Sequence, residues 1–234
     1  MAEKTATRIQ TSLLNELEKK ILLWLAERQP EWVNSDILTL IGLFGSVVIA
    51  AGYILTDCNI GWIWLASLGL VINWYGDSLD GTLARFRKTE RPIYGYYVDH
   101  TVDCINEFLM FAGIGISRLM RFDLAMILLI FYFLLTLNVA INAHLKSEFK
   151  LTYWKLGPTE FRLLVIIANT VLFFSKPLQE YQSSFTLFGR EIEIHALDIV
   201  GIVVLFVLAL FYITNVIADA RGYARIDPPK KKKE

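Results

Sequence analysis

The sequence predicts an all-α polytopic membrane protein with six transmembrane helices and an amphipathic helix before them. Hydrophobic residues make up 55% of the 234-residue chain, and several apolar runs approach or exceed the ~18–20 residues that a helix needs to cross a bilayer. Basic residues gather in alternate connections between these runs. We therefore divide the chain into an N-terminal interfacial segment (1–36), a transmembrane domain (37–225) and a basic tail (226–234).

The first expected element is an amphipathic helix over residues 9–28. Its apolar side chains recur at helical spacing, and most of its charged side chains fall elsewhere. Such a helix fits the interface between lipid and water, although the same pattern also fits a soluble helix packed on the protein. Glu16, Lys19 and Lys20 interrupt the apolar stretch, so we do not expect it to be a cleavable signal peptide.

Six apolar segments follow, and we expect each of them to cross the membrane as a helix. They cover residues 37–55, 61–86, 94–116, 124–145, 160–174 and 197–218. The second and third segments are unusual because each carries two aspartates. The fifth segment is short, so we expect it to be tilted or to end early.

The basic residues predict the orientation, because lysine and arginine favour the cytoplasmic side of a membrane. With the N-terminus in the cytoplasm, 19 of the 23 basic residues lie on the inner side. We therefore expect both termini in the cytoplasm, in a bacterial inner membrane or in the endoplasmic reticulum. The lysines at 230–233 favour contact with anionic lipid headgroups, and they also match a dilysine retrieval signal. We expect no nucleic-acid partner.

Four aspartates lie at the margins of the second and third segments: Asp77, Asp80, Asp99 and Asp103. A carboxylate in a membrane is energetically costly, which makes each a candidate functional residue. Their spacings of three and four residues place each pair on one face of a helix, and the two helices are antiparallel neighbours. Four converging carboxylates cannot all stay ionised without positive charge between them. Because hard oxygen ligands favour Mg²⁺, Mn²⁺ or Ca²⁺ over zinc or copper, we predict a site for two divalent cations.

Small and basic residues follow the first pair of aspartates directly. Gly81 and Ala84 allow another helix or a flat ligand to approach closely. Arg85 shares a helix face with Gly81, so it is placed either to pair with a carboxylate or to bind a phosphate.

Together these residues resemble the signature of the CDP-alcohol phosphotransferase family. The pattern in this chain is Asp77-x-x-Asp80-Gly81-x-x-Ala84-Arg85, then nine residues, then Gly95-x-x-x-Asp99-x-x-x-Asp103. All eight fixed positions and the length of the gap agree with the family. The chain departs from it at Ser35 and Asp36, where the family often has Pro-Asn, whereas Thr39 is kept.

The resemblance implies an enzyme that moves a phosphate-linked group from a CDP-alcohol onto a hydroxyl and releases CMP. It implies metal ligation by Asp77, Asp80 and Asp99, and it makes Asp99 and Asp103 the catalytic pair. Asp103 would bind metal or accept the proton of the attacking hydroxyl. The residues implied to contact CDP are Asp77, Gly81, Ala84, Arg85 and Gly95. The cofactor would be two Mg²⁺ or Mn²⁺ ions, which stabilise a transferring phosphate, and the family is often dimeric.

A second polar set flanks the junction of the fourth and fifth segments and is a candidate acceptor site. Its members are Lys146, Lys155, Glu160 and Arg162. Gly-Pro at 157–158 marks a break, so the next turn is a helix N-terminus, which favours anions. A phosphorylated alcohol such as inositol phosphate or glycerol phosphate would fit there. The lysines also fit ordinary flanking charge, whereas Arg162 lies one turn inside an apolar run.

The preferred function is therefore phosphatidyl transfer from CDP-diacylglycerol to a small polar alcohol. One alternative exchanges the lipid side, with CDP-choline or CDP-ethanolamine as donor and diacylglycerol as acceptor. Two others are a membrane prenyltransferase and a divalent-cation transporter, although the carboxylates of a transporter should lie near the middle of the bilayer.

Overall fold

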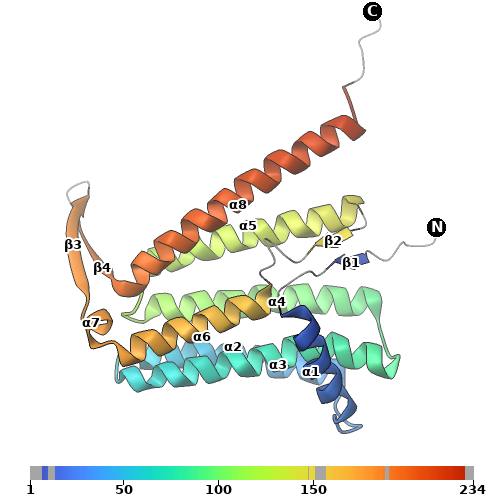
Figure 1. The fold of residues 1–234 in the computed structure, drawn as a ribbon, viewed down its shortest axis with the longest axis horizontal. Helices are drawn as coiled ribbons and strands as arrows, with labels where there is room; N and C mark the ends of the chain where they lie inside the picture. Colours follow the sequence, from blue (N-terminus) through green and yellow to red (C-terminus); the bar gives the residue numbers. More distant parts are fainter. Residues whose placement is uncertain (1–6, 10–13, 147, 151–156, 188–189, 230–234) are drawn as a thin grey trace, which may run out of the picture.

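The computed structural model describes residues 7–9, 14–146, 148–150, 157–187 and 190–229, which form a bundle of helices (Figure 1). The helices are α1 (Asn15–Glu27), α2 (Ser35–Leu55), η1 (Ile60–Trp62), α3 (Ile63–Arg87), α4 (Pro92–Ile116), α5 (Phe122–Lys146), α6 (Pro158–Phe174), α7 (Lys176–Gln179) and α8 (Ala196–Ile226). Two small sheets accompany them: β1 (Thr7–Ile9) pairs in parallel with β2 (Glu148–Lys150), and β3 (Gln182–Leu187) pairs antiparallel with β4 (Arg190–His195).

Six long helices occupy the six apolar segments that the sequence predicts. Within the described residues, three of them are long and apolar enough to cross a membrane: α2, α5 over Phe122–Leu145, and α8. The helices α3 and α4 form as expected but carry several charged residues, and α6 has only 17 residues. That α3, α4 and α6 also cross the membrane therefore stays a prediction.

The strands are a departure from the all-α expectation. A helix beginning at residue 9 is wrong, because Ile9 belongs to β1 and α1 begins at Asn15. The β3–β4 hairpin forms because Ile192 and Ile194 alternate with polar residues along β4, which is the period of a strand rather than of a helix. Most of the basic tail, at 230–234, lies outside the described residues.

The helices α2 and α3 pack with their backbones in direct contact. We call this contact the glycine seam; its members are Gly42, Gly45 and Gly52 of α2, and Gly69 and Gly76 of α3. A Cβ atom on Gly76 would lie 2.2 Å from the backbone nitrogen of Gly42, and one on Gly45 would lie 2.4 Å from that of Asn73. At Gly45, Gly52, Gly69 and Gly76 a larger residue would push the two backbones apart, so the seam fixes the rotation of α3 and hence the direction of its polar face.

Helix α1 lies across the end of the bundle where α3 ends and α6 begins (Figure 1). One face of α1 packs on the protein, because Glu18, Leu22 and Ala26 are buried. The other face exposes large apolar side chains, among them Leu17 at 58% and Trp24 at 53%. The structure thus shows packing on the protein, while the predicted position at a membrane interface stays a prediction.

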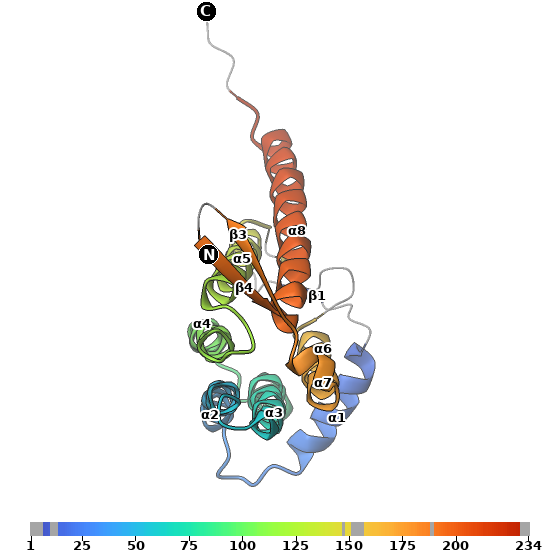
Figure 2. The same cartoon turned by 90° about the vertical axis from the view of Figure 1, so that its left-hand side faces the viewer.

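The opposite side of the molecule is more open. Helix α8 packs on α5 and β4 and leans away from α6 along its length (Figures 1 and 2). Successive long helices run in alternate directions, so the C-terminal end of α3 meets the N-terminal ends of α4 and α6. This arrangement gathers at one end the segments that carry the predicted site residues.

Candidate active site

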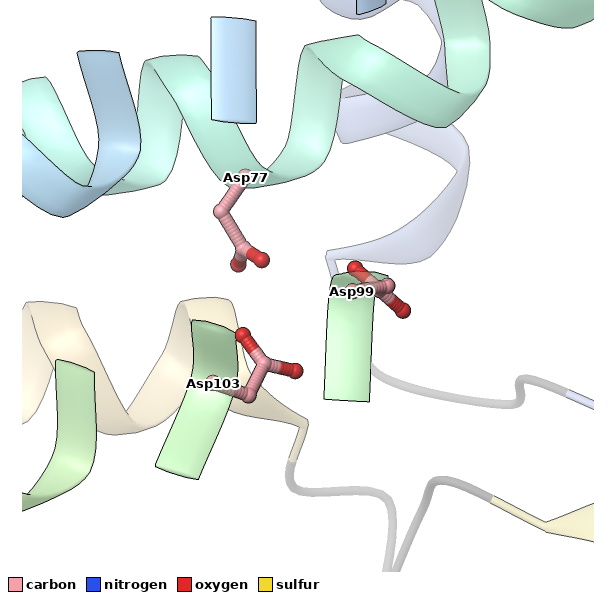
Figure 3. Close-up of side chains that lie close together, drawn as sticks. All are labelled: Asp77, Asp99 and Asp103. Atoms are coloured by element: carbon pink, nitrogen blue, oxygen red, sulfur yellow. The ribbon is translucent and has the colours of Figure 1, made fainter. Parts of the chain in front are cut away.

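Three aspartates from two helices converge at the end of the bundle near α1. Asp77 comes from α3, and Asp99 and Asp103 come from consecutive turns of α4. Each offers a carboxylate oxygen, and these three oxygens lie within 4.8 Å of one another. Figure 3 shows the side chains pointing toward a common centre. We call Asp77, Asp99 and Asp103 the aspartate cluster; its members sit where the antiparallel pairing of α3 and α4 was expected to place them.

Asp80 does not join the cluster, although the sequence predicts that all four carboxylates converge. Its Oδ2 accepts a hydrogen bond from the Thr39 hydroxyl at 2.7 Å, and its backbone carbonyl accepts one from the Ser35 hydroxyl at 2.9 Å. Both partners belong to α2, so its carboxylate is held toward that helix. Its ligation of a metal ion stays a prediction.

Arg162 connects α6 to the aspartate cluster. Its Nη2 donates to Asp77 Oδ2 at 2.6 Å, and its Nε donates to Asn73 Oδ1 at 2.9 Å. The Arg162 side chain is only 13% exposed. Asn73 in turn donates to the hydroxyl of Ser46 on α2, so the guanidinium rests on a network that includes three helices. The sequence predicts Arg162 as part of an acceptor site. In the structure its guanidinium is bonded to Asp77, the first aspartate of the motif.

The three carboxylates of the cluster repel one another when they are ionised, because their oxygens lie within 4.8 Å of one another. Arg162 pairs with Asp77, and the His100 ring lies 3.6 Å from Asp99. Positive charge beside the carboxylates favours their ionised form, which makes the aspartate cluster a candidate cation site.

A cavity of about 2000 Å³ opens at the aspartate cluster. One side of it is lined by the residues implied to contact CDP: Gly81, Ala84, Arg85 and Gly95. A Cβ atom on Gly95 would meet nothing within 4 Å, so space is available beside that backbone. The other side, which we call the apolar wall, consists of α6 and α8 residues that include Val165, Ala168, Val204 and Val207. The cavity thus offers a charged end and an apolar end to one ligand.

The rest of the predicted acceptor set lies differently. Glu160 is buried; its Oε1 accepts a hydrogen bond from the backbone nitrogen of Leu14, and its Oε2 accepts one from that of Gly157. These bonds cap the start of α6 and join it to α1, so Glu160 is better explained as a helix cap than as an acceptor ligand. Lys146 ends α5 at the same end of the bundle, and Lys155 lies outside the described residues.

Sequence reasoning missed two groups that line the cavity, Glu107 and Tyr132. Glu107 could have been found, because it continues the spacing of Asp99 and Asp103 by four more residues on the same face of α4. Tyr132 gives no such signal, because an aromatic residue inside an apolar helix is ordinary.

Comparison with known proteins agrees with this geometry. The sequence profile of CDP-alcohol phosphatidyltransferases matches residues 32–218. Over 84 residues the chain is 30% identical to a phosphatidylinositol phosphate synthase of Cutibacterium acnes (strain DSM 16379 / KPA171202), a match that covers 36% of this chain and 38% of that relative. The profile spans most of the chain and includes the whole aspartate motif, so the protein belongs to the CDP-alcohol phosphatidyltransferase family, as the eight motif residues predicted.

Proposed function

We propose that this protein transfers a phosphatidyl group from CDP-diacylglycerol to the hydroxyl of a small polar alcohol and releases CMP. The observation that carries this proposal is the aspartate cluster at one end of a cavity whose other end is apolar. The similarity to a phosphatidylinositol phosphate synthase supports phosphatidyl as the transferred group. The family match gives no support to the prenyltransferase or cation-transporter alternatives.

The donor set of the cluster suits a divalent cation. Three carboxylate oxygens within 4.8 Å of one another are hard ligands of the kind that Mg²⁺ and Mn²⁺ prefer. We propose that Asp77, Asp99 and Asp103 hold such ions, two in number, with Asp80 as a further ligand. When bound, the ions would supply charge neutralisation for the pyrophosphate and the departing CMP.

The chain's own residues position the reacting groups. The acceptor oxygen forms a bond to the phosphorus that bears diacylglycerol, while the bond from that phosphorus to the bridging oxygen breaks and CMP leaves with the electron pair. Asp103 accepts the hydroxyl proton in this proposal, because α4 places its carboxylate in the cluster. Gly81, Ala84, Arg85 and Gly95 would hold the CDP portion.

The apolar wall gives the acyl chains a place beside the charged site. The residues of α6 and α8 that line it are apolar and lie on helices that separate from each other (Figure 2). A lipid substrate could keep its tails in the bilayer while its headgroup reaches the aspartates. This geometry requires α3, α4 and α6 to lie within the membrane, so we propose six crossings with both termini in the cytoplasm.

The proposal is tested with purified protein, CDP-diacylglycerol, Mg²⁺ or Mn²⁺ and a panel of acceptors, by measuring CMP release and lipid products. We expect metal-dependent CMP release, and we expect Asp99→Asn to lower it about a hundredfold or more, because a charge that stabilises the transition state is removed. Asp227→Asn, at an exposed position past α8, is the matched control and should be neutral.

The alternative with the lipid on the acceptor is decided by the same assay. If CDP-choline plus diacylglycerol is consumed while CDP-diacylglycerol is not, the donor assignment is wrong. The acceptor, and not the CDP-linked donor, then carries the lipid. Homodimerisation, which the family resemblance implies, is checked on the same preparation by light scattering during size-exclusion chromatography.

The proposed orientation is testable at an existing cysteine. Cys58 is exposed in the connection between α2 and η1, which our topology places outside the cytoplasm. In a Cys104→Ala background, a membrane-impermeant maleimide should label Cys58 in right-side-out vesicles and not in inverted ones. Labelling only in inverted vesicles would reverse the orientation.

A further inference from the structure

Two buried polar atoms in the cavity lack a hydrogen-bond partner within the described part of the chain: Oε2 of Glu107 and Nη1 of Arg162. Both side chains line the same cavity as the aspartate cluster. A buried donor or acceptor without a partner is costly, and such groups are rare unless water, a ligand or an ion satisfies them. The pair therefore marks a place where a polar group, supplied by solvent or by a substrate, can bond to the protein.

Glu107 lies further along α4 than the aspartate cluster, whereas Arg162 is bonded to one member of the cluster. Glu107 follows Asp103 by four residues, which is about 6 Å further along α4 and away from its N-terminal end. The guanidinium of Arg162 cannot turn freely, because its Nη2 and Nε are already bonded to Asp77 and Asn73. The direction of Nη1 is thus fixed by contacts independent of any ligand. The carboxylate of Glu107 interacts electrostatically with both Asp77 and Arg162.

The chemistry of the pair selects the ligand group. A hydroxyl can donate its proton to Glu107 Oε2 and accept a hydrogen bond from Arg162 Nη1–H, so it satisfies both atoms at once. An ammonium group would lie beside the guanidinium, and a carboxylate would lie beside Glu107 and Asp103, so either would meet like charge. A methyl group would satisfy neither atom.

We infer that Glu107 and Arg162 form a recognition site for a second hydroxyl of the acceptor, which makes the acceptor a polyol. The inference rests on the proposed function and extends it: one hydroxyl reacts beside Asp103 while another is held one helical turn deeper. Glu107 is then a specificity-determining residue, which does not touch the reacting phosphorus. A single-hydroxyl alcohol leaves both buried atoms unsatisfied and reacts poorly.

The test compares acceptors that differ by one hydroxyl. Glycerol 3-phosphate is paired with 3-hydroxypropyl phosphate, and inositol 1-phosphate with its monodeoxy analogues, using the full chain with CDP-diacylglycerol and Mn²⁺. We expect wild-type protein to prefer a polyol over its deoxy partner about a hundredfold in kcat/KM, because a site built to bind a hydroxyl rejects the analogue that lacks it.

Substitutions at Glu107 test whether this residue causes the preference for the polyol. Glu107→Ala should lose most of it by slowing the polyol, with the KM for CDP-diacylglycerol unchanged. Glu107→Gln, which keeps an accepting oxygen and the same size, should retain part of it. The control is Glu90→Gln, because Glu90 is exposed just before α4 and does not line the cavity. Thermal unfolding of each variant separates a loss of fold from a loss of recognition.

Two results would overturn the inference while leaving the proposed function intact: wild-type protein that uses both members of each pair equally well, or a Glu107→Ala variant that slows both members equally. Absence of CMP release from CDP-diacylglycerol with every acceptor is a different result. It removes the proposed function, and the inference with it.

Discussion

The glycine seam and the apolar wall differ in how closely their helices approach. In the seam, α2 and α3 touch backbone to backbone, and residues such as Leu38, Ile49 and Leu79 beside it are fully buried. Along the wall, α8 exposes cavity-lining side chains, for example Val203 at 59% and Val200 at 48%. The seam supports Asp77, and the wall faces the proposed lipid site. A metal site needs fixed ligands, whereas an entry path for acyl chains needs helices that are not closed against each other.

The largest expected effect comes from adding one methyl group to the glycine seam, compared with adding one to the open side of the molecule. Gly76→Ala places a Cβ 2.2 Å from the Gly42 nitrogen, where only backbone movement can make room. We expect a loss of stability of about 3 kcal/mol or more, because overpacked backbone contacts relax poorly, together with loss of activity.

The matched control is Gly222→Ala on α8, where the added Cβ meets nothing within 4 Å. It should be neutral or stabilising by up to about 1 kcal/mol, since alanine favours a helix more than glycine does. The measurement is the melting temperature of both variants in the same detergent, compared with that of the wild-type protein. Equal melting temperatures would mean that the seam is no tighter than the open side.

Helix α1 joins the two regions, and Glu18 is the residue to change. Its Oε1 accepts hydrogen bonds from Trp74 Nε1 on α3 at 3.0 Å and from the hydroxyl of Thr159 on α6. Glu18→Ala leaves both donors unsatisfied and should destabilise the protein by about 2 kcal/mol. The exposed Glu16→Ala on the same helix should have little effect. If both variants melt alike, α1 does not hold α3 and α6 together.

The smallest expected effect is a change in KM for the lipid substrate, and it tests whether the apolar wall contacts that substrate. Val207 and Ile202 are similarly exposed on α8, at 41% and 49%, but only Val207 lines the cavity. Val207→Trp should raise the KM for CDP-diacylglycerol about tenfold, an effect of the size expected when a bulky side chain obstructs an apolar pocket. Ile202→Trp should leave that KM unchanged, and neither variant should alter the melting temperature. A rise in KM for both would place the lipid elsewhere.

The sequence predicted the six long helices and three of the four converging carboxylates well, because both follow from helical periodicity and antiparallel neighbours. It could not predict that Asp80 turns toward Thr39, since spacing sets the face of a helix and not the rotamer of a side chain. The bonds of Arg162 to Asp77 and of Glu160 to Leu14 join residues 85 and 146 positions apart. Such pairs depend on how helices pack, which local pattern does not specify. The strands were missed because the segments between apolar runs were assigned no structure.

The bond between Arg162 and Asp77 has a consequence for biosynthesis. In the six-span topology proposed above, α3 is synthesised well before α6, so the acidic face of α3 enters the bilayer before its basic partner exists. Insertion of the Arg162 guanidinium with α6 would then cost less when Asp77 already lies at the same depth. In that topology the contact that orders the finished site would also favour correct assembly, because α6 would insert readily only beside a correctly placed α3.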